Sequence, residues 1–412
     1  MSSRKKIAIL VDLELNDQSG GHVKFWERIS QSLVKKKLNI DLVFFFLGKK
    51  KKTIKVSENI NFHIYKPGFS SSNLSFLGID ADITDLSPIN LGLLFELRHY
   101  NLIHTTDQLH CMAKTAKLAS RIWKTPLTTS YHTDTPSYTE YYILEILKKL
   151  PNFLDKLFIK KLRIHKRISV SQKDKIREYI KDCKFAFVND DFTHKQMSFL
   201  KDNKIKVCKI SRGIDKKIFF KKQINKNIFL KKYKINPKNK LIFFCGRIHK
   251  LKGAVLLSQI NKILVEEGFN VTTVMAGGNI HGEECLKVCK KNLLILDYIN
   301  QTEVSKFLNI CDLFVFPSIY ETGPQVVLEA RSCGAVCIVS KDGGGKRIKK
   351  NREDGIILNN LSPENWSVEI IKLLKNKKKI KLMKDKVQLS NNYPSWEDIF
   401  YDIFFEKWKS II

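Results

Sequence analysis

The stretch from Cys311 to Gly345 constrains the fold more than any other part of the sequence. It opens with an apolar run, Leu313 to Phe316, which is typical of a strand buried in a parallel sheet. A polar loop and a predicted helix, Val326 to Ser332, then lead to a second apolar run, Ala335 to Val339. A strand, a helix and a strand in this order form a βαβ unit, so the sequence predicts an α/β protein.

Two carboxylates in this stretch indicate a ligand site. Glu321 and Glu329 flank the start of the predicted helix, where Pro324 suits the first position because its missing N–H costs nothing there. In an open α/β sheet, ligands bind at the carboxyl ends of the strands. Free N–H groups at a helix start favour an anion, and carboxylates accept hydrogen bonds from hydroxyl groups. The fitting ligand carries both phosphate and hydroxyl groups, as a nucleotide sugar does.

A second loop of the same half carries two cations. The segment GRIHKLKG, Gly246 to Gly253, directly follows a predicted strand and is bracketed by glycines that let the backbone approach a ligand. Arg247 offers a planar fork of donors and Lys252 a point charge. The pair is therefore predicted to clamp a diphosphate at the end of this strand.

The first half of the chain offers a glycine loop and a histidine. The loop with Gly20 and Gly21 follows a predicted strand, and it is either a ligand contact or an ordinary tight turn. His132 follows another predicted strand and reaches the same sheet edge, so we assign it a functional role. Asp134 and Tyr138 follow it in the segment HTDTPSY and are further candidate site residues.

The length of 412 residues favours two domains. We expect a first α/β domain at 1–215, closed by Arg212-Gly213-Ile214-Asp215, with Arg212 as a further candidate site residue. A Lys/Asn-rich linker is expected at 216–239, a second α/β domain at 240–394, and a helix at 395–412 that packs back on the first domain. Strands are expected at 7–11, 42–47, 60–65, 102–105, 127–131, 185–188 and 206–210, and then at 241–245, 272–275, 293–296, 313–316, 335–339 and 355–358.

The charge balance is strongly basic, with 73 Lys and Arg against 41 Asp and Glu. It has two readings: a lineage bias towards Lys, Ile and Asn, or an anionic partner. The predicted helical run 141–167 concentrates cations, so it either docks on an anionic bilayer or packs as an ordinary helix with a solvated basic face. We disfavour nucleic-acid binding, because the sequence holds no basic–aromatic module. Nucleic-acid binding would also leave the pair of Glu321 and Glu329 unexplained.

Nine cysteines are scattered without a CxxC pair, which disfavours a zinc site and suits a reducing cytoplasm. No stretch approaches the roughly 20 apolar residues of a spanning helix. The start, MSSRKKIAILVDLEL, lacks the apolar length and cleavage site of a signal peptide. We therefore expect a cytoplasmic protein, peripheral on the inner face of the cell membrane.

Together these motifs resemble the family 4 glycosyltransferases of the GT-B fold. The resemblance rests on GRxxxxKG at Gly246, on the Glu321-x7-Glu329 spacing and on the histidine loop. HTDTPSY and RGID are closest to the branch of sulfoquinovosyl-diacylglycerol synthases and related bacterial lipid glycosyltransferases. The sequence departs from the family in one loop, which often has an aromatic residue or Leu before Gly. Here that loop reads Thr322, Gly323, Pro324 and Gln325.

The resemblance implies two Rossmann-like domains that face each other across a cleft. It implies transfer of a hexose, with retention of configuration, from a UDP- or GDP-sugar to an acceptor hydroxyl, foremost on a membrane lipid such as diacylglycerol. A polysaccharide or lipopolysaccharide acceptor, or an epimerase or phosphorylase activity on the same fold, stays open as an alternative. No metal and no cofactor are expected, since cations and a helix start can neutralise the departing diphosphate.

The resemblance also assigns roles to residues. Arg247 and Lys252 are expected on the diphosphate, Glu329 on the ribose and Glu321 on the hydroxyls of the donor sugar. His132 is expected to face that sugar from the first domain. The other positions assigned to the donor are Gly20, Gly21, Thr322, Gly323, Pro324 and Gln325. Those assigned to the acceptor or the cleft are Asp134, Tyr138 and Arg212.

Overall fold

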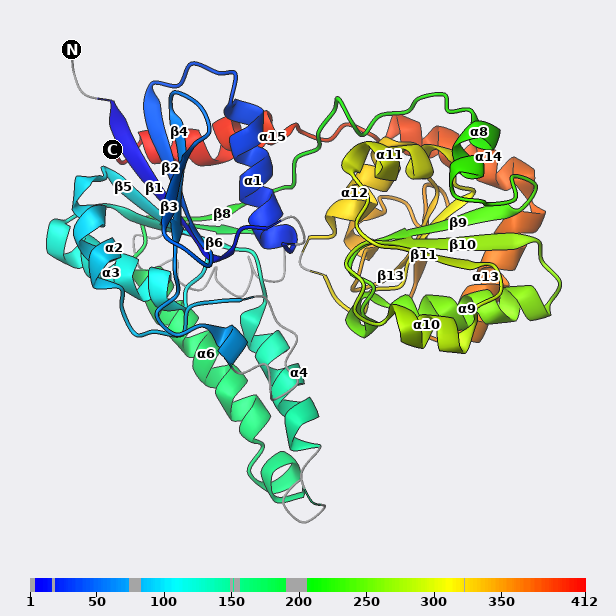
Figure 1. Ribbon diagram of the computed structural model, residues 1–412, viewed down its shortest axis with the longest axis horizontal. Helices are drawn as coiled ribbons and strands as arrows, with labels where there is room; N and C mark the ends of the chain where they lie inside the picture. The colour runs from blue at the N-terminus through cyan, green and yellow to red at the C-terminus, as the bar shows by residue number, and fades with distance from the viewer. Residues whose placement is uncertain are drawn as a thin grey trace. The chain divides into compact units, whose positions relative to one another are not determined.

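The computed structural model describes residues 4–16, 19–73, 83–148, 151, 156–189, 206–321 and 323–412. It divides into two compact units. Unit 1 comprises Met1–Arg212 and Trp396–Ile412, and unit 2 comprises Gly213–Ser395. Each unit holds its own sheet and its own hydrophobic core (Figure 1).

Among the described residues, unit 1 forms an eight-stranded sheet in the order β3-β4-β2-β1-β5-β6-β7-β8. Its pairs are parallel except that of β3 with β4. The strands are β1 (Lys5–Glu14), β2 (Ile40–Leu47), β3 (Lys52–Lys55), β4 (Ile60–Tyr65), β5 (Leu102–Thr105), β6 (Leu127–Tyr131), β7 (Phe185–Val188) and β8 (Lys206–Lys209). The main helices are α1 (Gly21–Leu33), α2 (Leu91–Glu96), α3 (Cys111–Trp123), α4 (Thr135–Leu147) and α6 (Ile164–Lys181).

One face of this sheet is covered by α1 and by the end of the chain. Trp26, Ile29 and Leu33 of α1 are fully buried, as their helical spacing predicts. The last segment runs through α15 (Trp396–Ile399), a π-helical turn (Phe400–Phe405) and α16 (Glu406–Lys409). Its Phe404 packs with a ring-centroid distance of 4.9 Å to Trp26, so the end of the chain belongs to the core of unit 1.

The basic helical region forms a hairpin. Helices α4 and α6 pack on each other and extend away from the sheet of unit 1 (Figure 1). A short π-helical turn, Lys156–Lys161, precedes α6, while 149–150 and 152–155 lie outside the described residues. Only Pro136 is buried in α4, and apolar side chains such as Ile143 and Leu147 are half-buried. The hairpin therefore keeps apolar and basic side chains accessible together.

Unit 2 forms a parallel six-stranded sheet in the order β11-β10-β9-β12-β13-β14. The strands are β9 (Lys240–Cys245), β10 (Val271–Ala276), β11 (Leu293–Leu296), β12 (Leu313–Phe316), β13 (Cys337–Ser340) and β14 (Ile356–Leu358). The helices are α8 (Lys226–Lys232), α9 (Ala254–Glu266), α10 (Gly282–Val288), α11 (Gln301–Ile310), α12 (Gln325–Ser332), α13 (Pro363–Lys375) and α14 (Lys377–Leu389). The predicted strand series is confirmed in both units, with ends that differ by a few residues.

Three features differ from the sequence expectation. Residues 216–239, expected as a linker, lie within unit 2 and contain α8; Phe219 and Leu230 are buried in its core. Strand β3 was not expected, because its Lys-rich sequence reads as loop, although it suits the exposed edge of a sheet. Pro324 is the N-cap before α12 rather than the first residue of that helix.

The strand order reverses once in each sheet, and these positions are where open α/β sheets bind ligands. In unit 1 the reversal lies between β1 and β5. In unit 2 it lies between β9 and β12. The loops that follow these four strands are therefore the first places to search for a site.

Candidate functional site

The two loops at the reversal point of unit 2 contact each other directly. The loop after β9 ends in a 3-10 turn, Lys250–Lys252, and the loop after β12 runs from Pro317 to Glu321. The backbone N–H of Ile319 donates to the carbonyl of Leu251 at 2.9 Å, and the Ser318 hydroxyl donates to the same carbonyl at 3.2 Å. The structure thus brings together the two motifs that the sequence placed apart.

Gly253 is required by this contact. Its φ is +76°, and a Cβ there would lie 2.1 Å from the carbonyl oxygen of Pro317. The expectation was that this glycine lets the backbone approach a ligand. The structure gives a different reason, since the neighbouring loop passes where a side chain would stand.

Lys252 and Glu321 form an ion pair, with 2.6 Å between Nζ and Oε1. Both side chains are largely covered, with exposed fractions of 15% and 17%. The Glu321 carboxylate, at 3.3 Å, is an alternative acceptor for the Ser318 hydroxyl. The residues expected on the diphosphate and on the donor sugar are therefore direct neighbours, and each holds the other in place.

The loop that follows β13 also holds the backbone of Glu321. The backbone N–H of Glu321 donates to the carbonyl of Asp342 at 3.0 Å. The Ser340 hydroxyl donates to the carbonyl of Ser318 and accepts the N–H of Gly343 at 3.1 Å. These bonds fix the backbone on both sides of the Glu321 carboxylate.

The other predicted donor residues of unit 2 lie around the same strand ends. Glu329 is buried one turn into α12, and Arg247 is half-buried directly after β9. Gly323 and Pro324 are buried, and the Gln325 side-chain amide donates to the carbonyl of Gly213 at 2.9 Å. Thr322 lies outside the described residues.

In unit 1, His132 lies in a stack of rings at the carboxyl edge of the sheet. Its ring is parallel to that of His22, with centroids 4.7 Å apart and an interplanar angle of 17°. His132 Nε2 is 2.8 Å from the Ser130 hydroxyl, and His22 Nε2 is 2.7 Å from the Thr106 hydroxyl. His22 was not predicted, because it lies inside α1, where a lone histidine carries no signal.

Three more predicted residues surround this stack. Gly20 caps α1 and Gly21 begins it. The Arg212 guanidinium donates to the carbonyl of Gly21 at 3.1 Å and lies over the ring of Phe25 at 5.5 Å. Arg212 therefore ties the end of the first half of the chain to the glycine loop.

Asp134 and Tyr138 occupy the start of α4. The Asp134 carboxylate caps this helix, accepting from the N–H of Ser137 at 3.3 Å and from its hydroxyl at 2.7 Å. It also accepts from the Tyr131 hydroxyl at 3.1 Å. Tyr138 is half-buried in the first turn. Asp134 thus holds the loop that carries His132.

Buried histidines in this region are kept neutral. Burial, with smaller contributions from His22 and Arg212, holds the pKa of His132 well below its ordinary value. Burial also lowers the pKa of His22 to about 4 and that of His104 well below the ordinary range. At neutral pH these rings therefore carry no charge.

Unit 1 should lose stability as the pH falls from about 6.5 towards 4. In that range the unfolded chain binds a proton at His22 and the folded chain does not, so acid favours unfolding. For His22 alone, a pKa lowered from 6.5 to about 4 corresponds to about 3 kcal/mol. Urea unfolding at pH 7 and pH 4.5 measures the loss.

The matched variants are His22→Gln and His99→Gln, since His99 is an exposed histidine of the same unit. We expect His22→Gln to flatten the pH dependence and His99→Gln to leave it unchanged. Equal slopes in all three proteins would contradict the neutral, buried state of His22.

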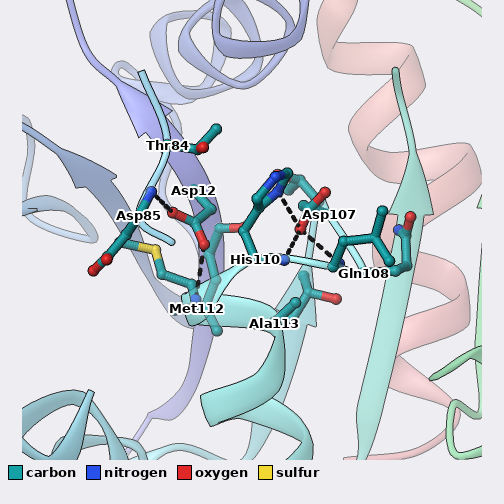
Figure 2. Close-up of polar contacts among 12 residues, drawn as sticks. Asp12, Thr84, Asp85, Asp107, Gln108, His110, Met112 and Ala113 are labelled. Atoms are coloured by element: carbon teal, nitrogen blue, oxygen red, sulfur yellow. Dashed lines mark hydrogen bonds and ion pairs between the residues drawn. The ribbon is translucent and has the colours of Figure 1, made fainter. Parts of the chain in front are cut away.

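A charged cluster at the reversal point of unit 1 was also missed (Figure 2). Asp107 Oδ1 is 2.9 Å from His110 Nδ1, and Asp12 accepts the N–H of Met112 at 2.8 Å. Burial opposes charge on both partners, but Asp107 raises the pKa of His110 to about 9, and His110 holds the pKa of Asp107 low. Burial raises the pKa of Asp12 to about 7. The polar run directly after β5 is the signal that could have indicated this pair.

Two doubly wound sheets with polar residues gathered at their reversal points define a two-domain protein of the GT-B type. The Anabaena protein HepE, solved with UDP and glucose, matches with a TM-score of 0.68 at 14% identity, over 98% of this chain and 100% of that one. Sucrose-phosphate synthase from Thermosynechococcus elongatus matches with a TM-score of 0.69 at 13% identity, over 99% of both chains. The predicted GT-B fold is thereby confirmed.

Residues 225–390, most of unit 2, match the family described as glycosyl transferases group 1. An N-acetylgalactosaminyltransferase of Campylobacter jejuni that acts on N,N'-diacetylbacillosaminyl-diphospho-undecaprenol is 29% identical, over 51% of this chain and 56% of that protein. An Escherichia coli galactosyltransferase that acts on GlcNAc-diphosphoundecaprenol is also 29% identical, over 37% and 41%. The chain spans about half the length of these curated relatives.

The described residues contain neither a candidate membrane-spanning helix nor a candidate metal-binding cluster. No helix there has the length and apolar character to cross a membrane. No group of three or more His, Cys, Asp and Glu side chains in those ranges is arranged to hold a metal ion.

Proposed function

We propose that this protein is a glycosyltransferase that moves a hexose from a UDP- or GDP-sugar to a lipid-linked acceptor. The observation that carries the proposal is the Lys252–Glu321 pair, at 2.6 Å, at the reversal point of a domain that matches the group 1 family. A bound diphosphate needs a cation beside it, and the hydroxyl groups of a sugar need a hydrogen-bond acceptor. Lys252 supplies the cation and Glu321 supplies the hydrogen-bond acceptor, and the two side chains lie at one place.

In the proposed reaction, the diphosphate takes Lys252 and Arg247 as partners, and Glu321 is released to accept hydrogen bonds from the sugar. Glu329 accepts from the ribose hydroxyls. As the bond to the sugar breaks, negative charge grows on the departing phosphate, which the two cations and the start of α12 stabilise without a metal. We further propose that configuration is retained, with the departing phosphate oxygen taking the proton of the acceptor hydroxyl.

The neutral state of His132 suits a role beside the sugar. An uncharged imidazole can accept or donate one hydrogen bond without opposing the positive charge that develops on the sugar ring in the transition state. Its Nε2 lies 2.8 Å from the Ser130 hydroxyl, and this contact orients the ring at the carboxyl edge of the sheet. His132 is thus proposed as a contact to a sugar hydroxyl.

The acceptor is proposed to be a lipid diphosphate that carries a first sugar. The Campylobacter and Escherichia coli relatives act on diphosphoundecaprenol-linked acceptors. A relative from Segniliparus rotundus is named as a D-inositol 3-phosphate glycosyltransferase. Phosphate-bearing acceptors are therefore favoured over diacylglycerol, the acceptor implied by the sulfoquinovosyl-diacylglycerol synthase branch.

The test is product analysis. The full chain is incubated with UDP- and GDP-sugars, with a sugar-diphosphate lipid, with diacylglycerol and with no acceptor, and the products are identified by mass spectrometry. We expect one added hexose on the diphosphate lipid, with the anomeric configuration of the donor. An epimerised donor without acceptor, or transfer to a soluble polysaccharide alone, would overturn the proposal.

We also propose that the protein acts as a peripheral protein on the inner face of the cell membrane, docked through residues 141–167. Each Lys or Arg near an anionic surface contributes about 1 kcal/mol before screening. Replacing Lys148, Lys149, Lys156, Lys160 and Lys161 with Gln should therefore weaken sedimentation with phosphatidylglycerol vesicles at least about tenfold at low salt. Lys149 lies outside the described residues.

The control for this experiment is a variant with the same loss of charge on another surface. Lys49, Lys50, Lys377, Lys378 and Lys381 are exposed and lie outside the hairpin. Their replacement with Gln should reduce binding only slightly. Equal losses in both variants would attribute the binding to net charge, and no binding by the parent protein would favour a soluble acceptor.

A further inference from the structure

Unit 1 contains a groove of about 850 Å³ between α3, the turn at 161–163 and α6. We call it the α3–α6 groove. Its volume lies within the range of small-molecule sites, about 300–1,000 Å³. The cations that line it come from all three elements: Lys114, Lys117, Lys161, Arg163, Lys166, Arg167 and Lys175.

The acidic residues of the groove are already paired with cations. Asp174 pairs with Arg177 at 2.9 Å, and Glu178 pairs with Lys181 at 2.5 Å. Of the lining cations, Lys117 pairs with Asp182 at 2.9 Å. The other lining cations form no ion pair within the part of the chain that the structure describes. The groove thus holds an excess of positive charge that favours the binding of an anion.

The rest of the lining is apolar. Leu109 and Leu162 contribute to the wall, and Val170 stands on the exposed face of α6 with 55% of its surface accessible. An apolar strip beside unpaired cations fits a ligand that joins an anion directly to a hydrocarbon chain. A free nucleotide or a sugar phosphate would leave this strip in water.

One end of the groove lies next to the histidine stack. Gln108 lines the groove, and its amide donates to the carbonyl of Ser130 at 3.0 Å and to the Thr129 hydroxyl at 2.8 Å. The Ser130 hydroxyl in turn contacts His132 Nε2 at 2.8 Å. A ligand in the groove therefore lies two hydrogen bonds from the candidate site of unit 1.

We propose that the α3–α6 groove binds the diphosphate of a polyprenyl-type lipid, with the first part of the chain against Val170 and Leu162. In this arrangement the cations of α6 hold the phosphates and Gln108 marks the end from which the attached sugar reaches His132. The inference rests on the proposed function for the identity of the acceptor. It adds the place where the acceptor's phosphates bind.

The test measures binding to the full chain without any donor. The probes are geranylgeranyl diphosphate, inorganic pyrophosphate and geranylgeraniol in the same detergent, followed by calorimetry. We expect the diphosphate lipid to bind at least about tenfold more tightly than either of the others, because both halves of the groove are then used.

Two groove variants and one matched control separate the contribution of the cations to binding from that of the apolar strip. Lys166→Gln/Arg167→Gln removes two cations, and Val170→Asp places a charge on the apolar strip. Each should weaken binding of the diphosphate lipid at least about tenfold. Lys49→Gln/Lys50→Gln carries the same charge change on a distant exposed loop and should leave the affinity unchanged.

Each outcome decides between sources of the anion. Equal affinity for pyrophosphate and the diphosphate lipid would overturn the lipid assignment in favour of a free-phosphate site. Competition by single-stranded RNA at matched charge, with the same response to the groove variants, would overturn it in favour of a nucleic acid. Unchanged affinity in both groove variants would overturn the groove itself.

Failure of the proposed function gives a different pattern. If the chain transfers sugar to the diphosphate lipid with an unchanged KM in Lys166→Gln/Arg167→Gln, the function stands and the groove is wrong. If the groove variants lose lipid binding but the parent protein transfers no sugar, the groove stands and the glycosyltransferase proposal fails.

Discussion

Replacing Lys252 with Ala should lower sugar transfer by about tenfold to a hundredfold, the equivalent of a charged hydrogen bond worth about 1.5–3 kcal/mol. The same is expected of Arg247→Ala. Lys252 is largely covered, and its Nζ is 2.6 Å from Glu321 Oε1. Its loss removes a contact to the diphosphate and also leaves the Glu321 carboxylate without its cation. Initial rates at saturating and limiting donor separate the two effects.

The neighbouring Lys250 provides a matched control on the same loop. Its side chain is 51% exposed and pairs with Glu284 at 3.1 Å, away from Glu321. Lys250→Ala should therefore leave transfer within about twofold of the parent protein, as is usual for exposed ion pairs. Near wild-type rates in both Lys252→Ala and Arg247→Ala would contradict the diphosphate assignment.

A double-mutant cycle tests whether Lys252 and Glu321 act as a pair. Glu321→Gln keeps a hydrogen-bond acceptor but removes the charge. We expect the two substitutions together to cost less than the sum of the single losses, because the first already breaks the ion pair. Additive losses would mean that the contact at 2.6 Å has no part in the reaction.

The strands could be predicted from the sequence because most are short apolar runs that are at least largely buried. Leu293–Leu296, Leu313–Phe316 and Phe185–Val188 have the expected ends, since a polar or turn residue stands on either side. The prediction for 216–239 was wrong. The Lys and Asn content of this region reads as a linker, but Phe219 and Leu230 alternate with those residues and are buried in unit 2.

The residues of the candidate site could be predicted only where the sequence pattern of a single segment indicates them. Lys252 and Glu321 each follow a recognisable strand, but their ion pair depends on β9 and β12 being neighbours, which follows from the strand order and not from spacing. His22 was missed for the same reason, because its ring partner His132 lies far away in the sequence. Asp107 and His110 are only three residues apart, and they were missed because the polar run after β5 was not interpreted as part of a site.

Arg331 is a buried cation on α12, the helix that also carries Glu329. Its side chain has no exposed surface, and its Nη2 is 2.7 Å from the Asp354 carboxylate. It also donates to the Asp354 carbonyl and the Tyr393 hydroxyl at 2.7 Å, and to the Ser390 hydroxyl at 2.8 Å. These bonds join α12 to the loop before β14 and to the segment after α14.

Arg331→Ala should therefore destabilise unit 2 by about 3–5 kcal/mol, because it leaves the buried Asp354 carboxylate without its cation. For a unit of this size, that corresponds to a fall of about 10 °C in its melting temperature. Arg352→Ala is the matched control, since Arg352 is 53% exposed and pairs with Glu369 on the surface. It should change the melting temperature by less than about 3 °C.

The same substitution also links stability to the site. Arg331 lies two residues after Glu329 on α12, so the bonds of its guanidinium fix the helix that carries the carboxylate expected on the ribose. Arg331→Lys keeps the charge but cannot reproduce the fork of donors, and we expect it to weaken donor binding while unit 2 remains folded. If Arg331→Lys binds UDP-sugar as tightly as the parent protein at a temperature where both are folded, the position of Glu329 does not depend on this network.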